Sequence, residues 1–363
     1  MERELLWLWL QSCAITRTKQ HKLLSHFGDI ESIYKANLSD LHGLDFLTSG
    51  DLNSLSKKDL SDAKDMQREL SKLSAKVISI DSPLYPDMLR KIHQSPSVLY
   101  ARGSYMDFNS SLCVAMVGMR KATNYGRTTA YNIARQLSEN GITVVSGLAM
   151  GIDAKCHEGA LAGGHPTVAV IGSGLDNIYP RINTALADKI LRNGAVLTEY
   201  PLGAKAEKYH FPERNRIISG MCKATIVVEA DLKSGSLITA RCATEENRDV
   251  FAVPGNINTL SSKGTNYLLK DGAQMLTSAR DIMDFYSIAY DLERIPSPAN
   301  PTSSLTVEEK ILLAIREEAV HKDMICERTC LDAGTVSAHL LMLEIRGKII
   351  KLAGGYYSQS KNI

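Results

Sequence analysis

Six apolar stretches, each about the length of a buried strand, recur between residues 112 and 255 and limit the folds open to this chain. They lie at 112–118, 142–147, 167–172, 195–199, 224–229 and 250–255. Helical patterns, such as 126–139 and 153–161, separate them. Unbroken apolar runs that alternate with helices are typical of a parallel sheet with helices on both faces. The sequence therefore predicts an α/β domain with a Rossmann-like, doubly wound parallel sheet.

Several of these runs end at glycine, and their ends indicate where a ligand would bind. Gly118, Gly147 and Gly172 close the first three runs, and Gly255 closes the last. Ligands of open parallel sheets bind beyond the carboxyl ends of the strands. We therefore expect these glycines to surround one crevice, with Arg120 just past the first of them.

The segment 211–216, with the sequence Phe-Pro-Glu-Arg-Asn-Arg, places an aromatic ring, an amide and two guanidinium groups at the predicted start of a helix. Helix starts carry unpaired N–H groups and a partial positive charge, so they favour anions. Arginine suits phosphate oxygens, and an aromatic ring suits a stacked base. The segment is therefore a candidate site for a ligand that has both phosphate and base.

Other polar groups are predicted to converge on the same crevice. Arg120 and Lys121 follow the first run, and Lys208 lies shortly before Phe211. Residues 234–236, Ser-Gly-Ser, follow the fifth run and start a helix, which is the arrangement of a backbone anion nest. The competing interpretation is that an arginine of 211–216 pairs with a carboxylate inside the fold.

Two enzyme classes are poorly supported. A dinucleotide fingerprint needs G-x-G-x-x-G after the first strand, and neither this motif nor a Walker A sequence is present. Asp153 and His157 lie at i,i+4 near Ser146, so a hydrolytic triad can be imagined. The simpler interpretation is that Asp153 lies near a helix N-terminus, where the dipole favours its charge.

The composition of the chain requires any nucleic-acid-binding surface to be a local basic patch. The net charge is +2, so the chain as a whole is not polycationic. Seven scattered cysteines contain no C-x-x-C pair, and neither a metal site nor a disulfide framework is predicted. The apolar patch at 5–10 is too short to span a membrane and lacks a small-residue cleavage site. A cytoplasmic protein without membrane contact is expected.

A chain of 363 residues is long enough for two or three domains. Short helices that end at glycine fill the first segment, and a Pro/Ser-rich linker precedes a tail with three helices and a hairpin. Three prolines are expected to keep the connector after the first segment extended and free of helix. The predicted domains are a helical module of sterile-alpha-motif or helix-hairpin-helix type at 1–75, the Rossmann-like domain at 76–290 (with an extended connector at 76–110), the linker at 291–304 and a winged helix at 305–363.

Ordered motifs along the chain point to one family. They are Gly118-x-Arg120, 146–153 (Ser-Gly-Leu-Ala-Met-Gly-Ile-Asp), 172–176 (Gly-Ser-Gly-Leu-Asp) with Tyr179-Pro180, 211–218 (Phe-Pro-Glu-Arg-Asn-Arg-Ile-Ile), 234–240 (Ser-Gly-Ser-Leu-Ile-Thr-Ala), and Pro254-Gly255 with 264–266 (Gly-Thr-Asn). Together they resemble the DNA-processing protein A (DprA/Smf) family, and the resemblance covers essentially the whole chain. One departure is Met119, where the family commonly has serine.

The resemblance implies a non-enzymatic protein that binds and protects single-stranded DNA, dimerises through its Rossmann-like domain and loads the RecA recombinase during natural transformation. Arg120 would hold phosphate, Lys208 and Phe211 would form a base pocket, and 234–236 would line the path of the strand. No cofactor is implied. The residues assigned to nucleic-acid binding are Gly118, Arg120, Lys121, Ser146, Gly147, Gly172, Lys208, Phe211, Arg214, Asn215, Arg216, Ser234, Gly235 and Ser236.

Two alternatives remain open at this point. One is a nucleotide phosphoribohydrolase of the related lysine-decarboxylase-like group, although that group carries P-G-G-x-G-T where this chain has Pro-Gly-Asn-Ile-Asn at 254–258. The other is a duplex-binding regulator that works through the winged helix. Its third helix, at 332–346, carries few cations, so a protein contact or a packing role is favoured for it.

Overall fold

The structure, a computed structural model, describes residues 3–288, 306–315, 320–329 and 331–359. The chain divides into an N-terminal unit, Met1–Asp291, and a C-terminal unit, Leu292–Ile363. Each unit has a hydrophobic core of its own. The linker predicted at 291–304 lies outside the described residues.

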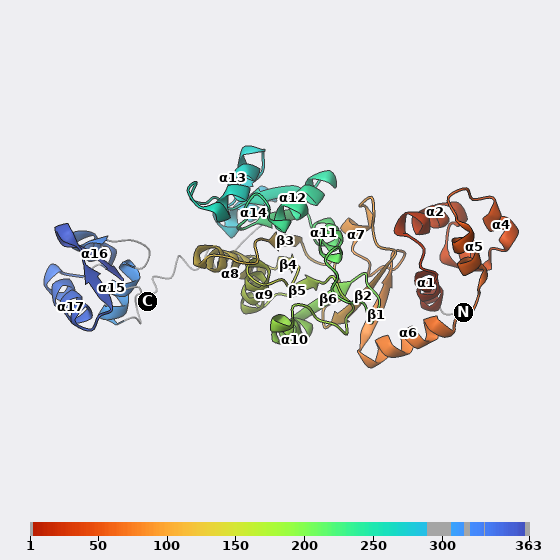
Figure 1. Cartoon of the computed structure of the whole chain (residues 1–363), viewed down its shortest axis with the longest axis horizontal. Helices are drawn as coiled ribbons and strands as arrows, with labels where there is room; N and C mark the ends of the chain where they lie inside the picture. Colours follow the sequence, from red (N-terminus) through yellow and green to blue (C-terminus); the bar gives the residue numbers. More distant parts are fainter. Residues whose placement is uncertain (1–2, 289–305, 316–319, 330, 360–363) are drawn as a thin grey trace. The chain divides into compact units, whose positions relative to one another are not determined.

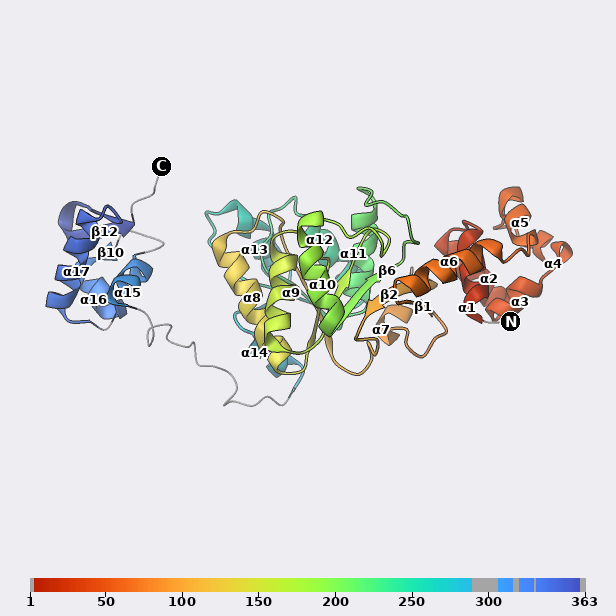
Figure 2. The same ribbon diagram turned by 90° about the horizontal axis from the view of Figure 1, so that it is seen from below.

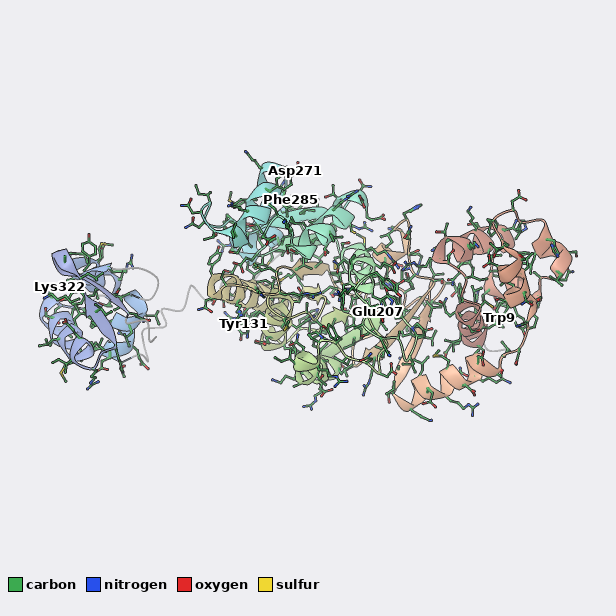
Figure 3. The ribbon with its side chains drawn as sticks, viewed as in Figure 1. Trp9, Tyr131, Glu207, Asp271, Phe285 and Lys322 are labelled. Atoms are coloured by element: carbon green, nitrogen blue, oxygen red, sulfur yellow. The ribbon has the colours of Figure 1, made fainter. Side chains whose placement is uncertain are left out.

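Residues 3–72 form a helical module whose helix ends follow local sequence signals. Gly28 ends one helix with φ at 87°, and Asn37 and Thr48 open two others with capping boxes. Trp9, labelled in Figure 3, is buried at the centre of the module, with its ring 4.9 Å from that of Tyr34. The helices are α1 (Arg3–Ser12), α2 (Arg17–Phe27), α3 (Ile30–Lys35), α4 (Leu38–His42), α5 (Ser49–Ser56) and α6 (Ser61–Lys72) (Figure 1).

Within residues 3–288, nine strands form one sheet in the order β1-β2-β6-β5-β4-β3-β7-β8-β9. The pairings β1–β2 and β2–β6 are antiparallel, and all the others are parallel. The strand order reverses at β3, which confirms the predicted Rossmann-like, doubly wound sheet. The strands are β1 (Ala75–Ser79), β2 (Val98–Gly103), β3 (Cys113–Val117), β4 (Thr143–Ser146), β5 (Thr167–Val170), β6 (Gly194–Thr198), β7 (Ala224–Val227), β8 (Asp249–Ala252) and β9 (Gln274–Met275).

Helices cover both faces of this sheet because its strands are apolar on both faces. On β3, Val114 and Met116 pack on one side, while Ala115 and Val117 pack on the other. One layer holds α8 (Asn124–Glu139), α9 (Ile152–Gly163), α10 (Thr184–Asn193) and α14 (Ala279–Phe285), and the first three lie side by side in Figure 2. The other layer holds α7 (Asp87–Arg90), α11 (His210–Gly220), α12 (Gly235–Glu245) and α13 (Lys263–Lys270).

The segment predicted as an extended connector is part of the sheet instead. β2 begins at Val98, two residues after Pro96, and joins β6 to β1. The helix α7 begins directly after Pro86, so this proline precedes a short helix and does not prevent it. Proline is tolerated at a helix start because the N–H groups there have no intrahelical partner.

The C-terminal unit is a winged helix, as the sequence predicts. Its elements are α15 (Val307–Ala314), β10 (Val320–His321), α16 (Lys322–Thr329), α17 (Ala333–Ile345), β11 (Ile349–Lys351) and β12 (Tyr356–Gln359). In the described part of this unit, the strands pair in the order β10-β12-β11, and the sequence analysis missed the two-residue β10. The capping box between Thr306 and Glu309 opens α15 as expected. Over all the described residues, every helix is too short or too polar to cross a membrane.

Candidate nucleic-acid interface

A cleft of about 760 Å³ lies where the strand order of the sheet reverses, beyond the carboxyl ends of the parallel strands. Segments that follow β3, β4, β5, β6 and β7 all contribute to its walls, together with the first turns of α11 and α12. Open α/β sheets bind their ligands in this position. The lining residues include Gly118, Met119, Arg120, Lys121, Ala149, Asp153, Tyr179, Lys208, Phe211, Pro212, Arg214, Asn215, Asp231, Ser234, Gly235, Ser236, Ile238 and Thr239.

An aromatic ring and a guanidinium group face each other in this cleft. The half-buried ring of Phe211 lies in the first turn of α11, and the guanidinium carbon of Arg120 is 5.2 Å from its centre. A second ring, that of Tyr179, has its centre 5.8 Å from that of Phe211 and is tilted by 41°. Arginine beside an aromatic ring is a cation–π contact, and the same pair can hold a base and its phosphate.

The start of α12 forms a second wall that suits an anion. Ser234 caps the helix, and its hydroxyl accepts a hydrogen bond from the Ser236 N–H at 3.4 Å. A side chain added at Gly235 would meet nothing within 4 Å, so the backbone here is open to a ligand. Asn215 Nδ2 lies 3.5 Å from the Gly235 carbonyl oxygen and links α11 to this nest. Helix N-termini of this kind bind phosphate through N–H groups and the helix dipole.

Three exposed cations of the cleft lack an acidic partner. Arg120, Lys121 and Lys208 are exposed, and in the part of the chain that the structure describes none of them forms an ion pair. Unpaired cations keep their charge available for phosphate oxygens. The loop that carries Lys208 also carries Glu207, which Figure 3 labels.

Arg214 lies at the floor of the cleft and is held by the protein itself. Its Nη1 donates to the Gly147 carbonyl oxygen at 2.7 Å and to the Val170 carbonyl oxygen, so it joins the ends of β4 and β5. Burial lowers the pKa of Arg214 to about 10, and the nearby Asp153 carboxylate opposes that shift. Burial also raises the pKa of Asp153, although Arg214 counteracts part of this effect. Arg214 therefore adds positive potential to the cleft, while its Nη1 is engaged by two backbone carbonyl oxygens.

Arg216 does not line the cleft, contrary to its assignment from sequence. It lies two residues after Arg214, so its side chain leaves α11 in a different direction. Its guanidinium donates to the Gln94 carbonyl oxygen and to the Glu199 carboxylate. Arg17 of the helical module also binds Glu199, at 2.7 Å, and reaches Glu213 at 3.1 Å. Arg216 is thus part of an internal ion network that ties α11 to the N-terminal helices.

Similarity to known proteins shows the family of this chain. Residues 76–287 match the family model of DNA recombination-mediator protein A, and residues 295–355 match the DprA winged helix domain. The chain belongs to the DNA recombination-mediator protein A (DprA/Smf) family.

Relatives of the family cover much or all of the chain. Protein Smf of Escherichia coli K12 is 37% identical over 77% of this chain and 76% of its own length. Protein Smf of Synechocystis is 32% identical over 97% of this chain and 98% of its own length. The solved structure of DNA processing protein A from Streptococcus pneumoniae is 35% identical, has a TM-score of 0.67 and covers 76% of this chain and 95% of its own. The structure of DNA processing protein A from Helicobacter pylori is described for its single-stranded DNA binding mode. It is 31% identical, has a TM-score of 0.55, and covers 61% of this chain and 99% of its own.

The glycines that the family motifs share have packing roles in this chain. A Cβ at Gly118 would lie 2.5 Å from Ile152 Cγ1, and one at Gly147 would lie 2.7 Å from the Arg214 guanidinium nitrogens. An added Cβ at Gly172 would lie 3.4 Å from Phe211 Cδ1, which is an ordinary contact distance, and the Gly172 carbonyl oxygen lies 3.0 Å from His210 Nδ1. Gly118 lines the cleft, Gly147 lines a small adjoining depression together with Arg120 and Phe211, and Gly172 lines neither.

Ser146, assigned to nucleic-acid binding from sequence, is buried and points into the protein. Its hydroxyl donates to the Met116 carbonyl oxygen at 2.6 Å, so it is not available to a ligand. His157 is also buried and contacts Thr167 Oγ1 at 2.8 Å through Nδ1. Burial lowers the pKa of His157 to about 3. Ser146 and His157 thus have separate internal partners, and the triad considered from sequence is not assembled.

The N-terminus of α8 in this chain is occupied by a carboxylate of the protein itself. The first helix after β3 would receive a pyrophosphate in a dinucleotide fold. Here the buried Glu229 carboxylate accepts hydrogen bonds from the Thr123 N–H at 2.9 Å and from the Thr123 hydroxyl at 2.8 Å. A carboxylate of the protein therefore occupies the N-terminus of α8 and repels phosphate from it.

Sequence reasoning missed several lining residues of the interface. Tyr179 was recognised only as part of the Tyr-Pro motif and was not assigned to the site, although its ring lies beside Phe211. Ile238 and Thr239 also line the cleft from α12. The signal for Tyr179 was its place just after β5, where loops of such sheets reach the ligand site.

Proposed function

We propose that this protein binds single-stranded DNA without sequence preference in the cleft beyond β3 and β7. The proposal rests mainly on the Phe211 ring, which has the Arg120 guanidinium carbon 5.2 Å from its centre and the Tyr179 ring beside it. Every base has a face that can stack on an aromatic ring, which makes such binding tolerant of sequence. The unpaired cations and the α12 nest would hold the backbone phosphates.

The family relationship supports this proposal. The Helicobacter pylori relative is described for its single-stranded DNA binding mode, and the Streptococcus pneumoniae and Bacillus subtilis relatives are DNA processing proteins. The family description, recombination mediator, supports the further proposal that the protein protects incoming strands and loads the RecA recombinase onto them during natural transformation. In this role the protein is not an enzyme, because binding and delivery require no bond to be broken.

Dimerisation through the Rossmann-like domain is part of the proposal. Large apolar side chains are exposed on the segment that runs from the end of β8 to α14, among them Ile257, Leu260, Tyr267 and Met275. β9 is also an edge strand of the sheet. Exposed apolar surface and an open edge are features of surfaces that pair with another chain. Sedimentation of the wild type and of Ile257→Glu tests this part, because a dimer interface here requires the variant to dissociate more readily.

The winged helix is proposed to contact protein and not duplex DNA. On α17, Leu341, Met342 and Ile345 are exposed, whereas a helix that reads the major groove presents polar and cationic side chains. Arg346, just past α17, is engaged by Glu308 at 2.8 Å. Competition between single strands and duplexes for the full-length protein separates this proposal from the duplex-regulator alternative.

Strand binding across a salt series tests the central proposal. Arg120→Ala and Lys208→Ala should each weaken binding to strands of any sequence and reduce the slope of log K against log salt by about 0.7. Arg192→Ala is the matched control, because Arg192 is exposed on α10 but does not line the cleft. Normal binding by both cleft variants in fluorescence anisotropy would show that the site is elsewhere. Release of free base from a nucleoside monophosphate would favour the phosphoribohydrolase alternative.

A further inference from the structure

A second hollow shares Arg120 and Lys121 with the Phe211 cleft. Its volume is about 430 Å³, and Arg120, Lys121, Arg127, Met150 and Ile182 are among the residues that line it. Sequence analysis assigned no role to Arg127, Met150 or Ile182. They come from α8, from the loop after β4 and from the short 3-10 helix Arg181–Asn183 that precedes α10.

The two hollows are connected by shared residues. Arg120 lines both of them, and it also lines a small depression of about 20 Å³ that shares residues with each. Tyr179 and Phe211 belong to this depression and to the Phe211 cleft, while Met150 belongs to the depression and to the second hollow. A chain-like ligand that is held at Arg120 can therefore continue from one hollow into the other across a continuous surface.

The second hollow has the chemistry of a backbone site. Arg120, Lys121 and Arg127 are exposed, and none of them has an ion-pair partner among the described residues. The described residues that line the hollow include no carboxylate and no aromatic ring. Its apolar part is aliphatic, with Ile182 76% exposed and Met150 47% exposed. Cations without an aromatic platform suit phosphate and sugar, whereas base stacking needs a ring.

From these observations we infer that the second hollow is a backbone-binding extension of the strand path, in which Arg127 holds a phosphate of the same strand whose base lies against Phe211. The inference rests on the proposed single-strand binding, because the cleft at Phe211 must hold the strand first. Positive grooves that follow a single strand hold several nucleotides, about 4 to 16 in the case of an OB fold. On this inference, a short strand occupies the Phe211 cleft, and a longer one continues past Arg120 into the second hollow.

The length of the strand therefore provides the test. Binding of oligothymidines of about four and about twelve nucleotides is measured by anisotropy over a salt series, for the full-length wild type, Arg127→Ala, Arg120→Ala and the control Arg192→Ala. We expect Arg127→Ala to bind the short strand as the wild type does, and to bind the long strand several-fold more weakly with a salt slope reduced by about 0.7. Arg127→Glu should enlarge the loss for the long strand only.

The remaining outcomes separate this inference from the proposed function. If Arg120→Ala weakens the binding of both strands but Arg127→Ala binds the long strand normally, the proposed extension is overturned. The proposed binding in the Phe211 cleft is then still supported. An equal loss for the short and long strands, or binding of two short strands per chain that Arg127→Ala reduces to one, also overturns the shared path. If neither strand binds the wild type, or if Arg120→Ala has no effect, the proposed function itself fails.

Discussion

The guanidinium carbon of Arg120 lies 5.2 Å from the centre of the Phe211 ring, although the two residues are far apart in the sequence. Arg120 follows β3, and Phe211 opens the helix that precedes β7, the neighbour of β3 in the sheet. The reversal of strand order thus brings a cation and an aromatic ring together. In this arrangement the ring contributes contact with a base, and the guanidinium contributes charge.

Phe211→Leu should separate these two contributions. The variant loses base stacking, so its free energy of binding to a single strand should be less favourable by about 1–3 kcal/mol, whichever base is present. The salt slope should not change, because no charge is removed. Anisotropy titration of homopolymeric strands with the wild type and the variant measures both quantities.

An abasic strand supplies the control for the Phe211 prediction. Without a base to stack, the wild type and Phe211→Leu should bind an abasic strand with equal affinity. A loss of affinity for the abasic strand as large as that for the normal strand would mean that the ring acts on the shape of the cleft and not on a base.

Glu199→Gln should destabilise the N-terminal unit strongly. The Glu199 side chain is 6% exposed and holds both Arg216, 12% exposed, and Arg17. Removal of its charge leaves the buried Arg216 guanidinium without its acidic partner, which lowers the free energy of unfolding by about 3 kcal/mol. Urea denaturation measures the change.

The matched control is Glu69→Gln, which breaks an exposed pair with Lys72 on α6. An exposed i,i+3 pair contributes less than about 0.5 kcal/mol, so this variant should unfold like the wild type. Equal effects of the two substitutions would contradict the role of Glu199 as the centre of an internal network.

Local sequence predicted the strands β3 to β8 but not β1, β2 and β9. The runs that became β3 to β8 are continuously apolar because helices cover both faces of the sheet. β1 is half-buried and lies before a proline-containing segment, and β9 has only two residues at the sheet edge. The existence of β1 and β9 depends on pairing with residues that are distant in the sequence, which periodicity does not report.

The same limit applies to the site. The sequence predicts that Arg120, Phe211 and the Ser234–Ser236 nest converge, because all three follow from where parallel strands end. It does not distinguish Arg214 from Arg216, because their roles depend on the Gly147 carbonyl oxygen and on the Glu199 carboxylate, which the fold brings from other strands. Ser146 was assigned to the site from the family resemblance, but its hydroxyl donates inward to the Met116 carbonyl oxygen.

His157 should make stability fall in mild acid. Burial lowers its pKa to about 3, whereas in the unfolded chain the pKa is about 6.5. Between these values the unfolded chain binds a proton that the folded protein excludes, so the free energy of unfolding decreases as the pH falls. From pH 7 to pH 5 the contribution of this one residue is a loss of about 2 kcal/mol.

His157→Gln isolates that contribution. Glutamine cannot titrate, but it can still form a hydrogen bond with Thr167, the present partner of the imidazole. The other titrating groups, including Asp153, are common to both proteins and cancel in the difference. Identical pH dependence of urea unfolding in the wild type and the variant would mean that His157 titrates in the folded protein with the same pKa as in the unfolded chain.

The strand site should function without the C-terminal unit. Among the residues that the structure describes, those that line the cleft all lie between Val117 and Thr239, and the N-terminal unit has its own hydrophobic cores. A chain that ends at Asp291 should therefore bind a single strand with the affinity and salt slope of the full-length protein, within about twofold, and Arg120→Ala should weaken both proteins alike. A lower salt slope in the shortened chain would show that cations of the winged helix contact the strand, contrary to the protein-contact role that the apolar surface of α17 favours.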